Sequence, residues 1–225
     1  MIEGLNLELV IFDCDGVLVD SEPASNRVFV EELRGLGLDI ESEDASMRFT
    51  GLSMASCMEI VSEQLGRAVP AGFAERLQSR TLTAFRDDGL DPVDGVQEML
   101  RRIDAPVCVA SSGEHEKMRL TLGLTGLLEH FEGRMFSATE VPRGKPHPDL
   151  FLLAARRMNA RPAGCVVVED SVPGVRGARA AGMTALGYAG RADGGELASA
   201  GAQVFHEMTE LPDLLGRLAA ERTKP

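Results

Sequence analysis

Short apolar runs rich in β-branched residues recur along this chain, and segments with helical spacing separate them. Such runs are typical of buried strands, and strands that alternate with helices indicate a parallel sheet covered on both faces. We therefore predict an α/β fold with a Rossmann-like parallel sheet as its core. The predicted strands are Leu7–Phe12, Pro106–Ala110, Arg134–Phe136, Cys165–Val168, Thr184–Leu186 and Gln203–Phe205.

Residues 21–90 interrupt this alternation, because they carry helical patterns and no convincing strand. We expect a small helical bundle there, inserted after the first strand into a core domain of residues 1–20 and 91–225. Each predicted helix presents one apolar face, and the methionine-rich face fits either a bundle core or a ligand pocket. The apolar residues at helical spacing are Met54, Met58, Val61 and Leu65, followed by Phe73, Leu77 and Ala84.

The composition is ordinary for a globular protein, with 44% apolar and 26% charged residues in a chain of 225. The 35 acidic and 23 basic residues give a net charge of −12. This charge disfavours a nucleic-acid partner, because binding to a phosphate backbone requires basic surface. No apolar stretch approaches the roughly 18 to 20 residues that cross a bilayer, and the first residues lack a signal-peptide pattern. We expect a cytoplasmic protein, with neither a membrane nor a protein partner implied.

The four cysteines are far apart and form neither a CxxC pair nor a cluster with the four histidines. Zinc-binding and disulfide frameworks are therefore not expected. Cysteines inside apolar runs behave as small hydrophobic side chains, and we expect all four to be reduced. They are Cys14, Cys57, Cys108 and Cys165.

An acidic motif, Asp13-Cys14-Asp15-Gly16, directly follows the first predicted strand. Alternate side chains of an extended backbone share a face, so the two aspartates point towards one site. Gly16 allows a turn and the close approach of a ligand at the carboxyl end of the strand. Crowded carboxylates repel one another unless a cation joins them, and Mg²⁺ is the usual choice beside phosphate. The motif predicts a metal site, and a solvated acidic turn is the alternative.

A second acidic pair, Glu169-Asp170, follows the predicted strand Cys165–Val168. Neighbouring parallel strands end at the same edge of a sheet, so Asp170 would complete the metal site begun by Asp13. Glu169 would support that site from behind. An N-cap of the next helix, formed by Asp170 or Ser171, is the second interpretation, and the two are compatible.

Two further segments supply groups that bind phosphate. Ser111-Ser112-Gly113 follows the strand Pro106–Ala110 and opens a helix, so a hydroxyl and backbone N–H groups would meet an anion there. Lys145 lies between a glycine and a proline in a loop that a second proline stiffens, where it would balance several carboxylates. Ordinary turn chemistry and a solvated lysine are the alternatives.

The DxDG motif, the serine at a strand end, the Gly144-Lys145-Pro146 loop and the Glu169-Asp170 pair together resemble the haloacid dehalogenase superfamily of phosphohydrolases. The likeness extends over nearly the whole chain, because the helical insertion resembles that family's cap. The segments FDCDGVLVDSE and VEDSVPG are similar to the branch of β-phosphoglucomutase and the sugar-phosphate phosphatases. The resemblance therefore implies an enzyme acting on a small phosphorylated metabolite, such as a sugar phosphate or 6-phosphogluconate.

The resemblance also implies roles for individual residues. Asp13 attacks phosphorus, and Asp15 protonates the leaving oxygen and then deprotonates the hydrolytic water. Mg²⁺ is held by Asp13, the backbone carbonyl of Asp15 and Asp170, with assistance from Glu169. The implied phosphate ligands are Ser111, the Ser112 amide and Lys145.

The sequence departs from the mutase pattern within the insertion. Ser25 and Met54 occupy positions where the mutase has a histidine and an arginine, which favours a phosphatase over a sugar phosphomutase. The residues that we name as cap contacts to substrate are Gly51, Ser53 and Arg80.

Two other classes of protein use a reactive aspartate. Dehalogenases of the superfamily attack carbon and do not need the aspartate at position 15. A phosphoacceptor signalling domain combines similar residues, but it is shorter, has no helical insertion and places its acidic pair before the phosphoacceptor. We therefore expect a Mg²⁺-dependent phosphatase.

Overall fold

The computed structural model describes residues 7–41, 44–45, 49, 54–190 and 192–222 of the chain. The chain divides into two compact units, one of Met1–Asp20 with Asp91–Pro225 and the other of Ser21–Leu90. We call the first the sheet unit and the second the helical unit, and each is described by itself.

The sheet unit is built on a six-stranded parallel sheet with the order β3-β2-β1-β4-β5-β6 among its described residues. The predicted α/β fold with a parallel core is thus confirmed. The bounds of each predicted strand differ from those of the observed strand by at most two residues. The strands are β1 Leu9–Phe12, β2 Val107–Ser111, β3 Met135–Ser137, β4 Cys165–Glu169, β5 Thr184–Tyr188 and β6 Gln203–Phe205.

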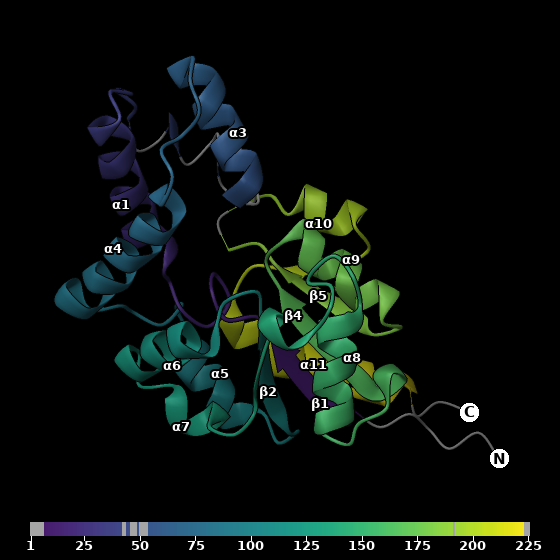
Figure 1. Ribbon diagram of the computed structural model, residues 1–225. Helices are drawn as coiled ribbons and strands as arrows, with labels where there is room; N and C mark the ends of the chain where they lie inside the picture. The colour runs from purple at the N-terminus through teal and green to yellow at the C-terminus, as the bar shows by residue number, and fades with distance from the viewer. Residues whose placement is uncertain (1–6, 42–43, 46–48, 50–53, 191, 223–225) are drawn as a thin grey trace. The chain divides into compact units, whose positions relative to one another are not determined.

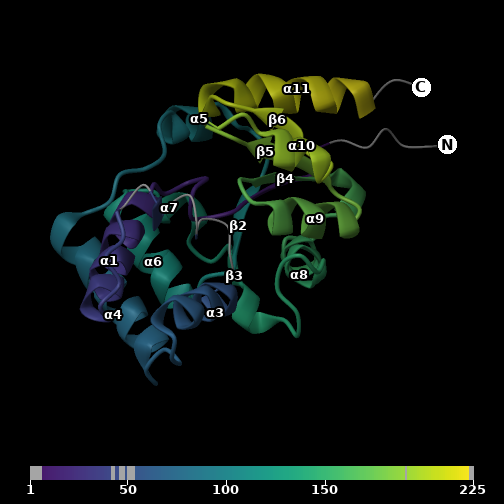
Figure 2. The same ribbon diagram turned by 90° about the horizontal axis from the view of Figure 1, so that it is seen from above.

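Helices cover both faces of this sheet (Figures 1 and 2). One face carries α8, α9 and α10, whereas α5, α6 and α7 lie on the other. None of the described helices is long and apolar enough to span a membrane. The helices are α5 Val96–Arg102, α6 His115–Leu124, α7 Leu128–Phe131, α8 Asp149–Arg157, α9 Val172–Ala180, α10 Gly195–Ser199 and α11 Leu211–Arg222.

The central strand β1 is fully buried, with Leu9, Val10, Ile11 and Phe12 all at 0% exposure. Leu9 and Ile11 belong to the hydrophobic cluster formed with α8 and α9. On the opposite face, the ring of Phe12 packs edge to face against Phe131 of α7, with centroids 6.1 Å apart. Because both faces of the strand are covered, every position must be apolar, which explains the continuous run in the sequence.

The chain order reverses at the boundary between β1 and β4. From β1 the strands proceed outward to β2 and β3 on one side, and the chain then returns to add β4, β5 and β6 on the other. Such a switch point opens a crevice at the carboxyl ends of the two strands, where ligands bind in open α/β sheets. Phe12 pairs with Val168, so Asp13 and Glu169 follow directly at this boundary.

The helical unit consists of helices packed around a separate apolar cluster. Its described helices include α1 Glu22–Gly35, α3 Met54–Leu65 and α4 Phe73–Asp88. Leu33, Val61 and Phe73 are buried in this cluster, and Met58 packs against it. The side chain of Met54 lies outside the described part of the chain, so the core interpretation of the methionine-rich face rests here on Met58.

A buried carboxylate links α1 to α4 within the helical unit. The side chain of Glu32 is only 9% exposed, and it accepts hydrogen bonds from Arg76 at 3.1 Å and Arg80 at 2.7 Å. Arg80 also donates to the exposed Glu31 at 2.6 Å. These bonds, chiefly the one from Arg80, lower the pKa of Glu32 even though burial opposes the shift. A carboxylate in this environment stabilises the unit only while its cations are present.

We predict that Glu32→Ala lowers the free energy of unfolding by about 1–3 kcal/mol, because it removes a buried hydrogen-bonded charge and leaves two arginines without that partner. Urea unfolding followed by circular dichroism measures the change. Glu31→Ala is the matched control, since its side chain is 46% exposed, and it should cost less than about 0.5 kcal/mol. Equal effects of the two substitutions would contradict the structural role of Glu32.

Candidate active site

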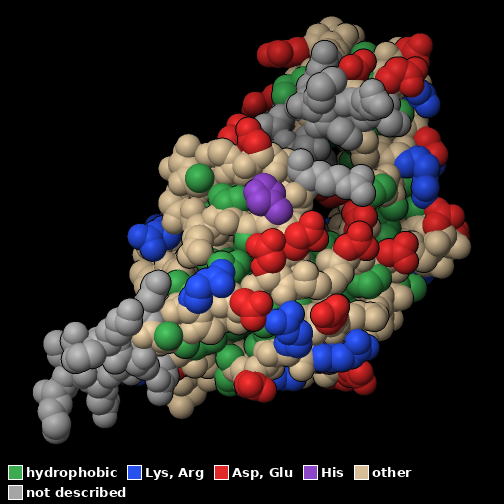
Figure 3. Space-filling view, turned by 180° about the vertical axis from the view of Figure 1, so that it is seen from behind, with side chains coloured by type: hydrophobic (Ala, Val, Ile, Leu, Met, Phe, Trp, Pro, Cys, Tyr) green, Lys and Arg blue, Asp and Glu red, His purple; other side chains and the backbone are tan. Residues whose placement is uncertain are grey.

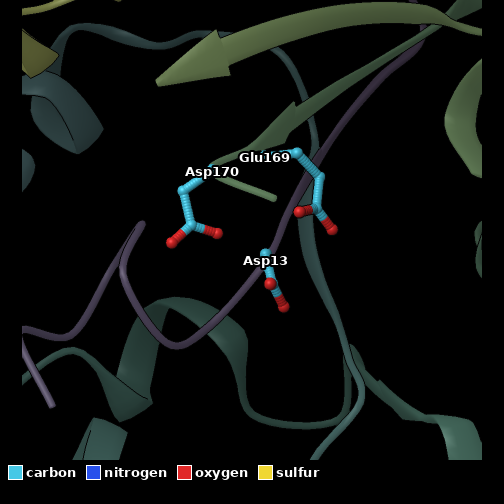
Figure 4. Close-up of side chains that lie close together, drawn as sticks. All are labelled: Asp13, Glu169 and Asp170. Carbon is cyan, nitrogen blue, oxygen red and sulfur yellow. The ribbon is translucent and has the colours of Figure 1, made fainter. Parts of the chain in front are cut away.

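Three carboxylates gather at the carboxyl ends of β1 and β4 (Figure 4). Asp13 directly follows β1, Glu169 is the last residue of β4, and Asp170 comes next in the chain. One oxygen from each of the three lies within 4.8 Å of the others. The backbone N–H of Asp13 donates to the carbonyl of Val168 at 3.0 Å, which fixes Asp13 to the sheet. The structure thus brings together three of the residues singled out in the sequence.

Lys145 provides a positive charge within this cluster. Its Nζ lies 2.9 Å from Oδ1 of Asp13 and 2.5 Å from Oε1 of Glu169. The three side chains are 4%, 13% and 0% exposed, respectively, so these ion pairs are almost completely withdrawn from water. Nζ also lies 5.5 Å from the ring centroid of Phe151 on α8. Removing Lys145 from so buried a group would leave the two carboxylates uncompensated.

The segment that follows β4 holds Glu169 in place. The hydroxyl of Ser171 donates to Oε2 of Glu169 at 2.8 Å and accepts from the backbone N–H of Gly174 at 3.1 Å. Ser171 is therefore the N-cap of α9, one of the two residues that the sequence offered for this position. The same hydroxyl both begins the helix and orients the carboxylate.

Two glycines make room for the carboxylates. A Cβ at Gly174 would lie 1.9 Å from the carboxyl carbon of Glu169, and a Cβ at Gly16 would lie 2.0 Å from Oδ2 of Asp170. Gly16 also has φ +76°, a conformation that favours glycine. The acidic side chains thus pack directly against backbone that carries no side chain.

The cluster carries three carboxylates but only one ammonium group among the residues named above. Burial, together with the charge of Glu169, raises the pKa of Asp13 to about 7, although Lys145 opposes the shift. Burial alone lowers the pKa of Lys145, but Asp13 and Glu169 outweigh it and raise the pKa. A divalent cation would supply the missing positive charge, and an all-oxygen donor set suits a hard cation such as Mg²⁺. The residues present therefore fit a metal site.

Asp15 has a different cationic partner from Asp13. Its Oδ2 lies 2.8 Å from Nζ of Lys117 on α6. The side chain of Asp15 is 30% exposed and that of Lys117 is 28% exposed. Between the two aspartates, Cys14 is buried with its Sγ 3.7 Å from the hydroxyl of Thr121. The two acidic side chains are thus held by separate lysines.

The loop after β2 carries the predicted phosphate-binding serines. Ser111 is buried at the end of the strand, and its hydroxyl accepts from the backbone N–H of Gly113 at 3.0 Å. The hydroxyl of Ser137, at the end of β3, donates to the carbonyl of Gly113 at 2.7 Å and ties the two loops together. Ser112 is exposed. Because β2 is the other neighbour of β1, these residues follow the strand next to Asp13.

The remaining candidate residues lie in the helical unit. Gly51 and Ser53 fall outside the described residues. Arg80 is engaged with Glu31 and Glu32 on α1, and its contact with a substrate stays a prediction. Sequence reasoning missed Lys117 and Ser137, because neither belongs to a motif and their roles depend on which loops meet in space.

The surface charge increases the importance of these lysines. Acidic side chains gather on the face shown in Figure 3, in line with the net charge of −12. A surface of this kind does not attract anions over a distance. An anionic ligand would therefore depend on local cations such as Lys145 and Lys117.

Comparisons with known proteins agree on one family. A model of the haloacid dehalogenase-like hydrolases matches residues 7–182. The chain is 31% identical to a 6-phosphogluconate phosphatase of Escherichia coli K12, over 92% of this chain and 94% of that protein. A haloacid dehalogenase-like protein of unknown function from Agrobacterium tumefaciens has a TM-score of 0.84 and 33% identity, covering 95% and 99% of the two chains. A related hydrolase from Deinococcus radiodurans, crystallised with phosphate and sodium, has a TM-score of 0.80 and 30% identity, covering 96% and 97%.

The raised pKa of Asp13 predicts how the stability of the metal-free protein depends on pH. Between about pH 4 and 7 the unfolded chain loses this proton while the folded protein keeps it, so the contribution of Asp13 to stability falls as pH rises through that window. Asp13→Asn removes this loss. Above pH 7, we expect the free energy of unfolding of the variant to exceed that of the wild type by about 2–4 kcal/mol. This difference should decrease towards pH 4.

The measurement is urea unfolding in chelator at a series of pH values. Asp20→Asn provides the control, because Asp20 is exposed and lies in the same segment of chain. If Asp13→Asn destabilised the metal-free protein at pH 8, the cluster would not carry the excess of negative charge described above.

Proposed function

Because the chain belongs to the haloacid dehalogenase-like hydrolases, we propose that it is a phosphatase that hydrolyses a small phosphate ester through an aspartyl-phosphate on Asp13. The observation that carries this proposal is the position of Asp13. Its carboxylate lies at the switch point of the sheet, beside the ammonium of Lys145 and within reach of two further carboxylates. Buried carboxylates are rarely grouped in this way for stability alone.

In the proposed first step, a carboxylate oxygen of Asp13 forms a bond to phosphorus as the bond to the ester oxygen breaks. Asp15 donates its proton to that oxygen, and the alcohol leaves. In the second step, water attacks phosphorus and gives a proton to Asp15, the bond to Asp13 breaks, and inorganic phosphate is released. A carboxylate nucleophile divides one difficult displacement into two easier steps, and a single acid/base serves both.

The carboxylate of Asp13 is held for this attack by two hydrogen-bonding groups. Its Oδ1 accepts from the backbone N–H of Cys14 at 2.8 Å and contacts Nζ of Lys145 at 2.9 Å. We propose that the transferring phosphoryl group is bound by Lys145, the hydroxyl of Ser111 and the backbone N–H of Ser112. Positioning and charge neutralisation supply most of the catalysis in such transfers.

We assign a Mg²⁺ site to Asp13, Asp170 and the backbone carbonyl of Asp15, with Glu169 in support. When bound, the cation would neutralise charge on the phosphate and allow it to approach the carboxylates. The excess of carboxylates over ammonium groups supports this assignment. The phosphate and sodium in the Deinococcus radiodurans structure are consistent with it.

The proposed substrate class is a phosphorylated sugar or sugar acid, such as 6-phosphogluconate. Its support is the 31% identity to the Escherichia coli 6-phosphogluconate phosphatase over nearly the full length of both proteins. Measuring the phosphate released from a panel of phosphorylated metabolites would identify the preferred ester.

We predict that hydrolysis requires both the nucleophile and the cation. Asp13→Asn should lower phosphate release to background, because the amide does not attack phosphorus. Chelator should abolish wild-type activity and added Mg²⁺ restore it, since the carboxylates would otherwise repel the substrate phosphate. A colorimetric phosphate assay measures both effects, with Asp20→Asn as the control that keeps wild-type activity. Full turnover in chelator would contradict the metal assignment, and normal turnover by Asp13→Asn would contradict the covalent mechanism.

A sugar phosphomutase would use the same sheet unit, and the helical unit distinguishes the two activities. Ser25 on α1 is half-buried and offers a hydroxyl, whereas Met54 offers a thioether, so neither supplies a charge for a second phosphate. A mutase must keep its sugar bisphosphate intermediate bound while that intermediate reorients in the site. This demand is unmet by these two side chains, which supports the phosphatase.

We therefore predict that the protein releases inorganic phosphate and performs little isomerisation. Given β-glucose 1-phosphate and catalytic glucose 1,6-bisphosphate, it should form glucose 6-phosphate at less than about one tenth of its phosphatase rate on the preferred ester, because water reaches the aspartyl-phosphate first. A coupled dehydrogenase assay measures the isomerisation. Rapid glucose 6-phosphate formation that depends on the bisphosphate, with little phosphate release, would establish the mutase instead.

A further inference from the structure

Lys117 contacts the proposed acid/base although it belongs to none of the motifs. It is the third residue of α6, and its Nζ lies 2.8 Å from Oδ2 of Asp15, 102 positions earlier in the sequence. The two side chains are 28% and 30% exposed. In comparison, Arg119, also on α6, forms an ion pair with Glu132 at the end of α7, and these two side chains are 53% and 64% exposed. The pair formed by Lys117 is thus the better shielded from water.

The helix that carries Lys117 is anchored firmly beneath the site. Met118 and Leu122 of α6 are buried in the core. Thr121, one turn after Lys117, contacts the thiol of Cys14, the residue between the two aspartates. The base of the Lys117 side chain is therefore fixed relative to the DxD segment by a second contact that does not involve Asp15.

The stem of Lys117 follows a defined course along the loop after β2. A Cβ built on Gly113 would lie 3.4 Å from Cδ of Lys117 and 3.4 Å from the hydroxyl of Ser111. The aliphatic stem thus passes beside the loop that we assign to the phosphoryl group before its ammonium group reaches Asp15. Burial alone lowers the pKa of Lys117, but the Asp15 carboxylate outweighs this effect and raises the pKa. Lys117 therefore carries its charge at neutral pH.

We infer that Lys117 is a positioning residue that holds the Asp15 carboxylate in the orientation required to accept the proton of the attacking water. This inference rests on the proposed function, in which Asp15 serves both half-reactions. An aspartate at the start of a turn can rotate about two side-chain torsions, and an ion pair from an anchored helix restricts that rotation. Misplacement of a catalytic group by about 1 Å can cost on the order of 100-fold in rate.

The test begins with Lys117→Met, which keeps most of the aliphatic stem and removes the ammonium group. We expect kcat to fall about 10- to 100-fold, because Asp15 has lost this ion pair, while KM and the Mg²⁺ concentration for half-maximal activity stay within about threefold. Arg119→Met is the matched control on the same helix and should keep wild-type kcat. Thermal unfolding shows whether each variant is folded, and Lys117→Gln replaces Lys117→Met if the latter is not.

A double substitution separates a positioning role from a direct contact with substrate. If Lys117 acts through Asp15, adding Lys117→Met to Asp15→Asn should change kcat by less than about threefold. A further tenfold loss in the double variant would show that Lys117 acts independently of Asp15, and a kcat within twofold of wild type for the single variant would also overturn the inference. Normal turnover by Asp15→Asn would reject the proposed mechanism, an outcome distinct from the failure of the inference alone.

Discussion

The ion pairs of Lys145 with Asp13 and Glu169 are the interaction on which the rest of the candidate site depends. They place an ammonium group in a region that is nearly closed to water, where two unpaired carboxylates would be very costly. Surrounding features serve the same arrangement: Ser171 orients Glu169, and Gly174 leaves room for its carboxylate. Even so, carboxylates outnumber ammonium groups among these residues, and burial together with the charge of Glu169 raises the pKa of Asp13. The protein thus tolerates an unfavourable local charge at the position where we propose a reactive carboxylate.

Much of the fold was predictable because burial determines which residues each strand can use. Strand β1 is covered on both faces, so its residues are continuously apolar, and the same holds for β4. The strand ends were less certain. Glu169 belongs to β4 although it is charged, since pairing with Gly187 of β5 extends the strand by one residue. Backbone hydrogen bonds of this kind do not depend on side-chain polarity, and a hydropathy pattern therefore misses them.

Some residues of the candidate site could also be predicted from the sequence, whereas others could not. Asp13, Glu169 and Asp170 follow strands directly, and the parallel order of the sheet brings their positions together, so the sequence suffices to group them. Lys117 reaches Asp15 through a long side chain from a helix, and its direction depends on how α6 packs. Arg80 also depends on packing: its contact with a substrate stays a prediction, and its ion pairs with Glu31 and Glu32 were not predicted from the sequence. A long basic side chain can reach several carboxylates, and the sequence alone does not determine which of them it pairs with.

The attachment of Asp13 to β1 couples the integrity of the site to the cooperativity of the whole sheet. All four residues of β1 are completely buried, and the backbone N–H of Asp13 continues the hydrogen-bonding between β1 and β4. Local openings in proteins are confined largely to exposed loops and frayed ends, whereas central strands open only with global unfolding. The backbone of the proposed nucleophile should therefore become disordered only when the whole sheet unfolds. Its backbone amide and those of β1 should be among the slowest in the molecule to exchange hydrogen with solvent.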